Sequence, residues 1–217
     1  MIPKDAFRLL AELEANNHRD WFQANRDAIR SSVQEPFAEV LGAISEELAG
    51  ADLPLSGGAD TMFRMNRDVR FSADKSPYNA SASGLLTPSG NKDESAGIMY
   101  LHMDKDGGFL ACGFYKMPTS HLNTIRDRIV ARPDAFRAAI DDLSEAGLAL
   151  SSDMMLKGMP RGYADHADAW FAEHLRRKVL IVREDLDTES WTSGAVVATA
   201  AGIARASAGL LRFGAAA

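Results

Sequence analysis

Residues 62–78 read MFRMNRDVRFSADKSPY, and this stretch says most about the fold. Apolar and polar side chains alternate along its first half. The apolar set is Phe63, Met65 and Val69, and the polar set is Arg64, Asn66 and Asp68. Strict alternation puts two such sets on opposite faces of a strand. The sequence therefore predicts a β-strand over residues 61–69 with one buried face and one polar face.

A β-hairpin is predicted further along the chain. Residues 98–104 and 109–116 flank the segment Lys105-Asp106-Gly107-Gly108, and apolar runs joined by a short Gly-containing turn are typical of a hairpin. Met99, Leu101 and Met103 are expected to face the core, with Tyr100 and His102 on the other side. Shorter strands are predicted at 83–87 and 179–183.

Helical spacing of apolar side chains appears on both sides of this β-rich middle. It predicts helices over 4–15, from Pro36 to about residue 48, from Thr119, from Pro133, and over the Ala-rich segment 194–213. No long linker interrupts the chain. We therefore predict one α+β domain spanning 1–217, with a central antiparallel sheet, N-terminal helices on one face and C-terminal helices beside it.

Three segments resemble a family of bacterial and fungal proteins, domain of unknown function 2461. They are RDVRFSADKSPY at 67–78, LAELEANNHRDWF at 10–22, and LKGMPRGY at 156–163 followed by His166. The sequence departs from the family pattern at Ala167, where a Pro is expected. The resemblance implies an α+β domain and no particular activity, because the family has no established one.

Composition narrows the functional classes. A net charge of −6 argues against general nucleic-acid binding, which needs a basic surface, although a local basic strip stays open. Cys112 is the only cysteine, so the chain can form no internal disulfide and no cysteine metal cluster. The five histidines lack the spacing of a helical zinc site, and we predict no metal and no cofactor. Without a signal peptide or an uninterrupted membrane-length apolar run, we expect a cytoplasmic protein that does not bind membranes.

The charged stretch suggests an anion site. Residues 62–78 hold three Arg and one Lys against two Asp, and guanidinium groups match phosphate or carboxylate in a planar fork. If the predicted strand 61–69 lies near strand 98–104, Arg64, Asn66, Tyr100 and His102 converge. The predicted ligand-binding residues are Arg64, Asn66, Arg67, Arg70, Lys75, Tyr78, His102, Lys157 and Arg161.

Each of these residues also has a plainer interpretation. The Arg, Asp and Lys side chains of 67–75 can form an internal ion-pair network that only orders a loop, with Arg67 or Arg70 paired to Asp68 or Asp74. Tyr78 can be a satisfied core tyrosine, and His102 an incidental strand residue. The two leading hypotheses are a domain that binds a small anionic ligand, with catalysis left open, and a structural or protein-interaction module. No nucleophile motif of the Gly-x-Ser-x-Gly kind is present.

Overall fold

A computed structural model describes residues 1–93 and 97–215 of the chain. Its centre is an antiparallel sheet of four strands in the order β1-β2-β3-β4. The strands are β1 (Ala82–Leu86), β2 (Ile98–Asp104), β3 (Gly107–Phe114) and β4 (Leu180–Leu186). The sheet confirms the α+β class and the hairpin predicted around residues 98–116.

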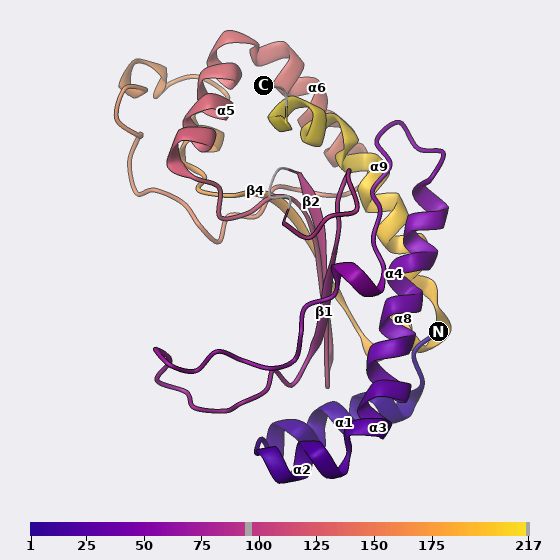
Figure 1. Ribbon diagram of the computed structural model, residues 1–217. Helices are drawn as coiled ribbons and strands as arrows, with labels where there is room; N and C mark the ends of the chain where they lie inside the picture. The colour runs from indigo at the N-terminus through magenta and orange to yellow at the C-terminus, as the bar shows by residue number, and fades with distance from the viewer. Residues whose placement is uncertain (94–96, 216–217) are drawn as a thin grey trace.

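Helices precede and follow the sheet. The N-terminal helical elements are α1 (Lys4–Ala15), α2 (Arg19–Ala24), α3 (Arg26–Ile29), the π-helical turn η1 (Arg30–Gln34), α4 (Glu35–Leu48) and the short η2 (Ala59–Thr61). The later ones are α5 (Thr119–Ala131), α6 (Pro133–Glu145), η3 (Ala164–His166), α7 (Ala172–Arg176), α8 (Thr188–Ser193) and α9 (Ala195–Ala215). In Figure 1, α4, α8 and α9 cover one face of the sheet, which leaves the opposite face free of helices.

The core lies between the sheet and α4 and α9. Met99, Leu101 and Met103 are fully buried, as the alternation of β2 predicts. Close packing also depends on small residues. A Cβ on Gly84 would lie 2.6 Å from Leu41 of α4, so the strand and helix approach each other only because this position lacks a side chain.

The Ala-rich C-terminal helix is part of this core. α9 is long and apolar enough to cross a membrane by length and composition, yet 56% of its most apolar window is buried inside the molecule. Ala200, Ala201 and Ala204 are among its buried residues. Their small side chains let the helix axis approach the sheet and α4 closely.

The tight hairpin between β2 and β3 requires its glycines. Gly107 and Gly108 adopt φ values of 121° and 114°, which side chains rarely permit. A Cβ on Gly107 would also lie 2.1 Å from the carbonyl oxygen of Leu186 in β4. The Gly-Gly pair thus serves both the turn and the approach of the third strand to the fourth.

The strand predicted at residues 61–69 does not form, and this prediction is wrong. Only single bridges occur there, joining Met62 to Gly84 and Asn66 to Tyr78. The chain leaves the sheet after Met62 and returns at Asn79, and we call residues 62–79 the arm. Its two legs bond to each other, since Arg67 N donates to Pro77 O and Asn79 N donates to Met65 O. Phe63, expected in the core, is 43% exposed.

Candidate functional site

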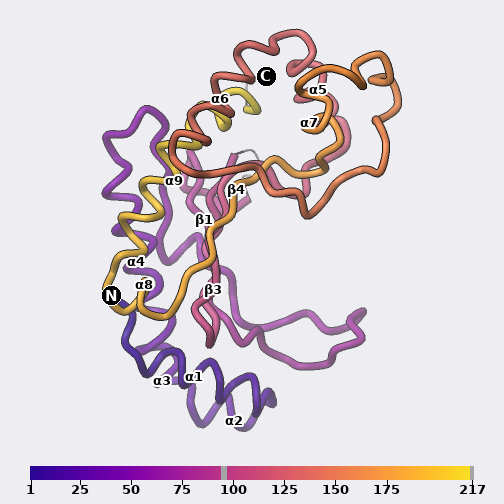
Figure 2. The backbone as a smooth tube through the Cα atoms, turned by 180° about the vertical axis from the view of Figure 1, so that it is seen from behind, coloured from indigo at the N-terminus to yellow at the C-terminus, as the bar shows by residue number. Residues whose placement is uncertain are grey.

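A cavity of about 930 Å³ lies on the helix-free face of the sheet. Its floor consists of outward-facing strand residues. They are Ser83 and Leu85 of β1, Ile98, Tyr100 and His102 of β2, Phe109, Ala111 and Gly113 of β3, and Ile181 and Arg183 of β4. Figures 1 and 2 show the arm and the segment between α6 and α7 projecting from the same side of the sheet. The arm and residues 151–154 supply side chains at opposite ends of the cavity.

Strand register brings the floor residues together. His102 pairs with Ser83 on one side and Phe109 on the other, and Tyr100 pairs with Leu85 and Ala111. The small Ala111 lets the Tyr100 and Phe109 rings meet, with centroids 5.8 Å apart. The result is an aromatic floor with His102 stacked on Phe109 at 5.1 Å.

Tyr100 and His102 form the polar centre of the floor. The Tyr100 hydroxyl lies 3.2 Å from His102 Nδ1, and the Asp104 carboxylate lies 3.6 Å from His102 Nε2. Burial lowers the pKa of His102, opposed by Asp104 and assisted by Arg183. The imidazole is therefore neutral near pH 7, and its Nδ1 can accept a hydrogen bond from the Tyr100 hydroxyl when Nε2 carries the ring hydrogen. A phenol, an imidazole and a carboxylate in this sequence are equipped for proton transfer.

Arg183 borders the floor on the β4 side. Its guanidinium carbon lies 3.9 Å from the centroid of the Phe109 ring, a cation–π contact. The same guanidinium lies 2.9 Å from the Asp185 carboxylate. Because Asp185 already balances its charge, Arg183 mainly fixes the ring of Phe109.

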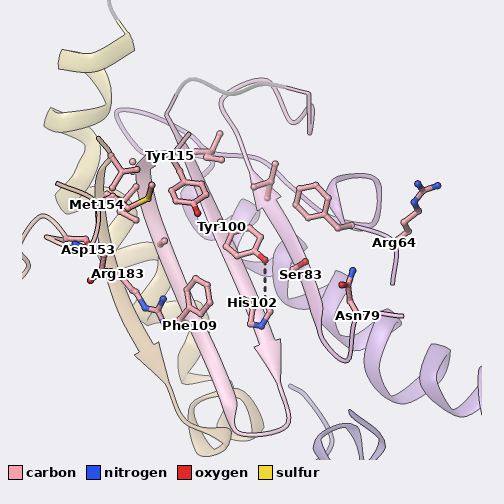
Figure 3. Close-up of a pocket in the computed structure, with 18 of the residues that line it drawn as sticks. Arg64, Asn79, Ser83, Tyr100, His102, Phe109, Tyr115, Asp153, Met154 and Arg183 are labelled. Carbon is pink, nitrogen blue, oxygen red and sulfur yellow. Dashed lines mark hydrogen bonds between the residues drawn. The ribbon is translucent and has the colours of Figure 1, made fainter. Parts of the chain in front are cut away.

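Arg64 stands at the opposite edge of the cavity, as Figure 3 shows. Its side chain is exposed and, within the described part of the chain, makes no hydrogen bond or ion pair. The nearby Asp68 carboxylate bonds to Arg70 instead, at 2.7 Å. The guanidinium of Arg64 is thus available to an anion that enters the cavity.

Sequence comparison places the chain in a family. The family described as "Conserved hypothetical protein (DUF2461)" matches residues 5–213. The protein belongs to this family. No curated protein and no solved structure matches the chain. The family membership anticipated from the three motifs is confirmed over nearly the whole chain.

In this family member, the cavity gathers four of the residues predicted from the sequence. Arg64, Asn66, Arg67 and His102 all line it, together with Tyr100. Arg67 is already engaged, since its guanidinium donates to Asp74 at 2.5 Å and to Ser76 O at 3.1 Å. The expected convergence of the 61–69 segment on β2 therefore occurs, although by an arm and not by a strand.

The other predicted residues lie outside the cavity lining. Arg70 bonds to Asp68, and Lys75 Nζ donates to Val69 O at 3.0 Å. Tyr78 is buried and stacks on Phe22 with ring centroids 3.8 Å apart. Lys157 and Arg161 are exposed on the segment between α6 and α7. A ligand-binding role for these five residues stays a prediction, whereas the ion pairs expected for Arg67 and Arg70 are present.

Several cavity residues were not predicted from the sequence. Phe109 carried a signal, because it alternates with Leu110 on the second strand of the predicted hairpin. Tyr115 carried the same signal, because it lies on the same face of that predicted strand. Arg183, Asp153 and Met154 carried none, since the pairing of β3 with β4 and the path of residues 151–154 are set by tertiary contacts.

The described residues contain no candidate metal site. No group of three or more His, Cys, Asp or Glu side chains there is arranged to hold a metal ion. Cys112 is fully buried, and burial raises the pKa of its thiol to about 12. A thiol with that pKa is not a nucleophile at neutral pH.

Proposed function

We propose that the cavity binds a small organic anion, whose apolar or planar body rests on the aromatic floor and whose phosphate or carboxylate is held by Arg64. The lining supports this combination. Leu85, Ile98, Ile181 and the rings of Tyr100 and Phe109 offer apolar contact, and charged and polar side chains such as Arg64 and Asp153 stand at the two ends of the cavity. Apolar pockets with a few placed polar groups are the usual sites of small ligands, and their usual volumes of about 300–1,000 Å³ include this cavity.

The observation that carries the proposal is the state of Arg64. Of the three arginines that line the cavity, Arg67 is paired with Asp74 and Arg183 with Asp185. Arg64 has no such partner and sits beside Phe63, whose ring lies 6.3 Å from that of Tyr100. Figure 3 shows the Arg64 side chain at the edge of the cavity with its guanidinium pointing away from the floor, so a ligand held there reaches Tyr100 and Phe109 only if its apolar body extends inward past the edge.

The Tyr100–His102 pair adds a chemical capability to this proposal. It places a proton donor and a proton acceptor next to each other below the bound ligand. General acid–base catalysis needs such a pair within hydrogen-bond reach of the reacting group. Proton transfer is accordingly the reaction class that the site supports best, should the ligand be a substrate.

A structural role is the second candidate for the charged motif, and specific contacts favour it for part of the motif. Arg67–Asp74 and Arg70–Asp68 are ion pairs within the arm, and Asp74 Oδ1 also accepts from Ser76 N at 2.9 Å. These bonds satisfy the charges locally. The motif therefore divides into Arg64, which is free to bind, and residues 67–76, which hold the arm together.

The test is a thermal-shift and calorimetry screen with benzoate, phenyl phosphate and adenosine monophosphate. Acetate and inorganic phosphate serve as anions without an apolar body, and benzyl alcohol as a ring without charge. A ligand at a hundred times its dissociation constant adds about 2.7 kcal/mol to the free energy of unfolding. We expect the aromatic anions to bind and the simple anions and the alcohol to bind much more weakly.

Substitution of single arginines tests whether the anion binds at Arg64. Arg64→Ala removes a charged hydrogen bond worth about 1.5–3 kcal/mol, so affinity for the aromatic anion should fall roughly ten- to a hundredfold. Arg19→Ala is the matched control, an exposed arginine outside the cavity lining. The proposal is wrong if no aromatic anion binds, or if Arg64→Ala and Arg19→Ala bind equally well.

A further inference from the structure

The arm is built as a rigid projection. Its root is fixed by Asn17, whose side-chain amide donates to Tyr78 O at 2.9 Å and whose carbonyl accepts from Tyr78 N at 3.1 Å. The Tyr78 ring stacks on Phe22 of α2 with only 7° between the planes. Further out, the Arg67–Asp74 pair and the Lys75–Val69 bond tie the two legs together. The arm thus has a fixed direction, away from the helix-covered face of the sheet (Figure 1).

The tip of this projection carries an aromatic side chain in water. Phe71 is 97% exposed, the highest value among the large apolar residues described. The Arg70 guanidinium lies 5.9 Å from its ring centroid, and the Arg70 side chain is 76% exposed. The bonds within the arm therefore hold the Phe71 ring in solvent beside Arg70. Asp68 accepts from Nε and Nη2 of Arg70, and Nη1 makes no bond within the described chain, so it is left for a partner. Aromatic and Arg side chains are the residues that dominate binding at protein interfaces.

A complementary surface lies at the far end of the cavity. Tyr115 and Met154, 46% and 37% exposed, are two of the remaining exposed large apolar residues, and both line the cavity. Asp153 is beside Met154, and its carboxylate makes no hydrogen bond or ion pair with any described residue. Figure 3 shows Asp153 and Met154 on the side of the cavity away from Arg64. This docking end offers apolar contact for a ring and a carboxylate for a guanidinium.

We propose that the protein forms a dimer in which the Phe71–Arg70 tip of each copy docks at Tyr115, Met154 and Asp153 of the other. Both halves of the match belong to one chain and face the same side of its sheet, so a two-fold axis between two copies satisfies both contacts at once. Such self-complementary interfaces are the commonest in homo-oligomers. The charges agree at the contact itself, since the Arg70 side chain is a 76% exposed cation and the Asp153 carboxylate is unpaired among the described residues.

The contact forms between copies and not within one. The arm is rooted next to β1, whereas Tyr115 follows β3, and Asp153 and Met154 lie beside β4 at the opposite edge of the sheet. The Asn17 and Phe22 contacts at Tyr78 would have to break for the tip to fold back. A lipid surface suits the tip less well, because residues 68–75 hold one exposed aromatic ring and equal numbers of cations and anions.

The dimer closes the proposed ligand site without depending on it. The tip of the partner occupies the Tyr115 end, and the Arg64 end stays open to a small anion. Association is therefore measured in the absence of any ligand. It should be unaffected by Arg64→Ala, so failure of one proposal leaves the other standing.

The experiment is sedimentation-velocity ultracentrifugation with light scattering, at protein concentrations of about 10–100 μM. Wild type should show twice the 23.5 kDa mass of the chain. Phe71→Ser should be monomeric, and Phe71→Leu, which keeps an apolar tip, should retain most of the dimer. Phe71 has no packing to lose, so these variants should unfold at the wild-type temperature, and circular dichroism checks this.

Exchanging the charges of Arg70 and Asp153 tests whether these two residues meet across the dimer interface. Arg70→Asp and Asp153→Arg should each raise the dimer dissociation constant at least tenfold, and the double variant should recover much of the loss. Ala73→Ser, also exposed on the arm, is the control and should dimerise normally. A monomeric wild type overturns the proposal, as does a dimer that survives Phe71→Ser or charge reversals that show no mutual rescue.

Discussion

The role of each arginine in this protein depends on which side chains lie next to it. Arg64, Arg67 and Arg70 lie within seven positions of one another and look equivalent in the sequence. In the structure, Arg67 and Arg70 are paired with Asp74 and Asp68, and only Arg64 is left without such a partner in the described part of the chain. Because the carboxylate of a paired guanidinium already takes up part of its charge and donors, the three side chains are not interchangeable.

The ion pairs of the arm illustrate how exposure sets energetic weight. A buried Arg–Asp pair would lose several kcal/mol when one partner is removed. Arg70 and Asp68 are both largely in solvent, where water screens the attraction and replaces lost bonds. These charges therefore shape the arm and contribute little to the stability of the whole fold.

A pH prediction belongs to His174. Burial, followed by the neighbouring Arg177, lowers the pKa of His174 to about 4, against an opposing effect of Glu173. Its Nδ1 is buried with no hydrogen-bond partner among the described residues, and its ring contacts Phe136. As pH falls below about 6.5 the unfolded chain takes up the proton first, so stability is lost between about pH 6.5 and 4.

Urea unfolding at pH 7 and pH 5 measures this loss. The His174 contribution should be about 2 kcal/mol over that interval, at 1.36 kcal/mol per pH unit once the unfolded histidine titrates. His174→Gln should remove that part of the pH dependence. Equal pH dependence in wild type and His174→Gln would contradict the assignment.

At the scale of elements, local pattern predicted some parts and not others. The hairpin of β2 and β3 and the helix α4 follow from spacing that neighbouring residues alone define, and the structure confirms them. The arm has the alternation of a strand but is not one. Its backbone groups bond across its own two legs, and Pro77 offers no N–H to a sheet. Alternation reports which side chains share a face, and it does not report which backbone the segment pairs with.

Asn17 is the element-scale test of the arm. Asn17→Ala removes both bonds to the backbone of Tyr78, so the free energy of unfolding should fall by about 1–3 kcal/mol. The arm should also become more sensitive to trypsin at Arg67, Arg70 and Lys75. Asn16→Ala is the control, because the Asn16 side chain donates to Glu12 O within the first helix and makes no bond to the arm among the described residues. Unchanged cleavage of the arm in Asn17→Ala would show that Asn17 does not hold its root.

For the whole molecule, the prediction concerns how tightly α9 packs against the rest of the fold. Ala201 is fully buried, whereas Gly202 is exposed with no atom within 4 Å of its added Cβ. Ala201→Leu should cost about 1–3 kcal/mol through overpacking. Gly202→Ala should instead stabilise by about 0.5–1 kcal/mol, because it lowers the entropy lost when the helix forms. Chemical denaturation of both variants measures whether the free energy of unfolding falls for Ala201→Leu and rises for Gly202→Ala. An unchanged free energy of unfolding in Ala201→Leu would contradict the tight packing of α9 around this position.

The sequence by itself determined the α+β class, the family, the hairpin with its buried Met99, Leu101 and Met103, and the main helices. Each of these depends on a motif or on the spacing of apolar residues along a short segment. Such spacing can be read from the sequence whatever the arrangement of the segments in space. Tertiary structure alone decided that residues 62–79 leave the sheet, that Arg64 stands free while its neighbours are paired, and that Arg183 and Asp153 border the same cavity as His102. Those facts arise from the pairing of β3 with β4 and the anchoring of Tyr78 by Asn17, contacts between residues 61 or more positions apart. No local period encodes such a contact, because its free energy exists only when both segments are already in place.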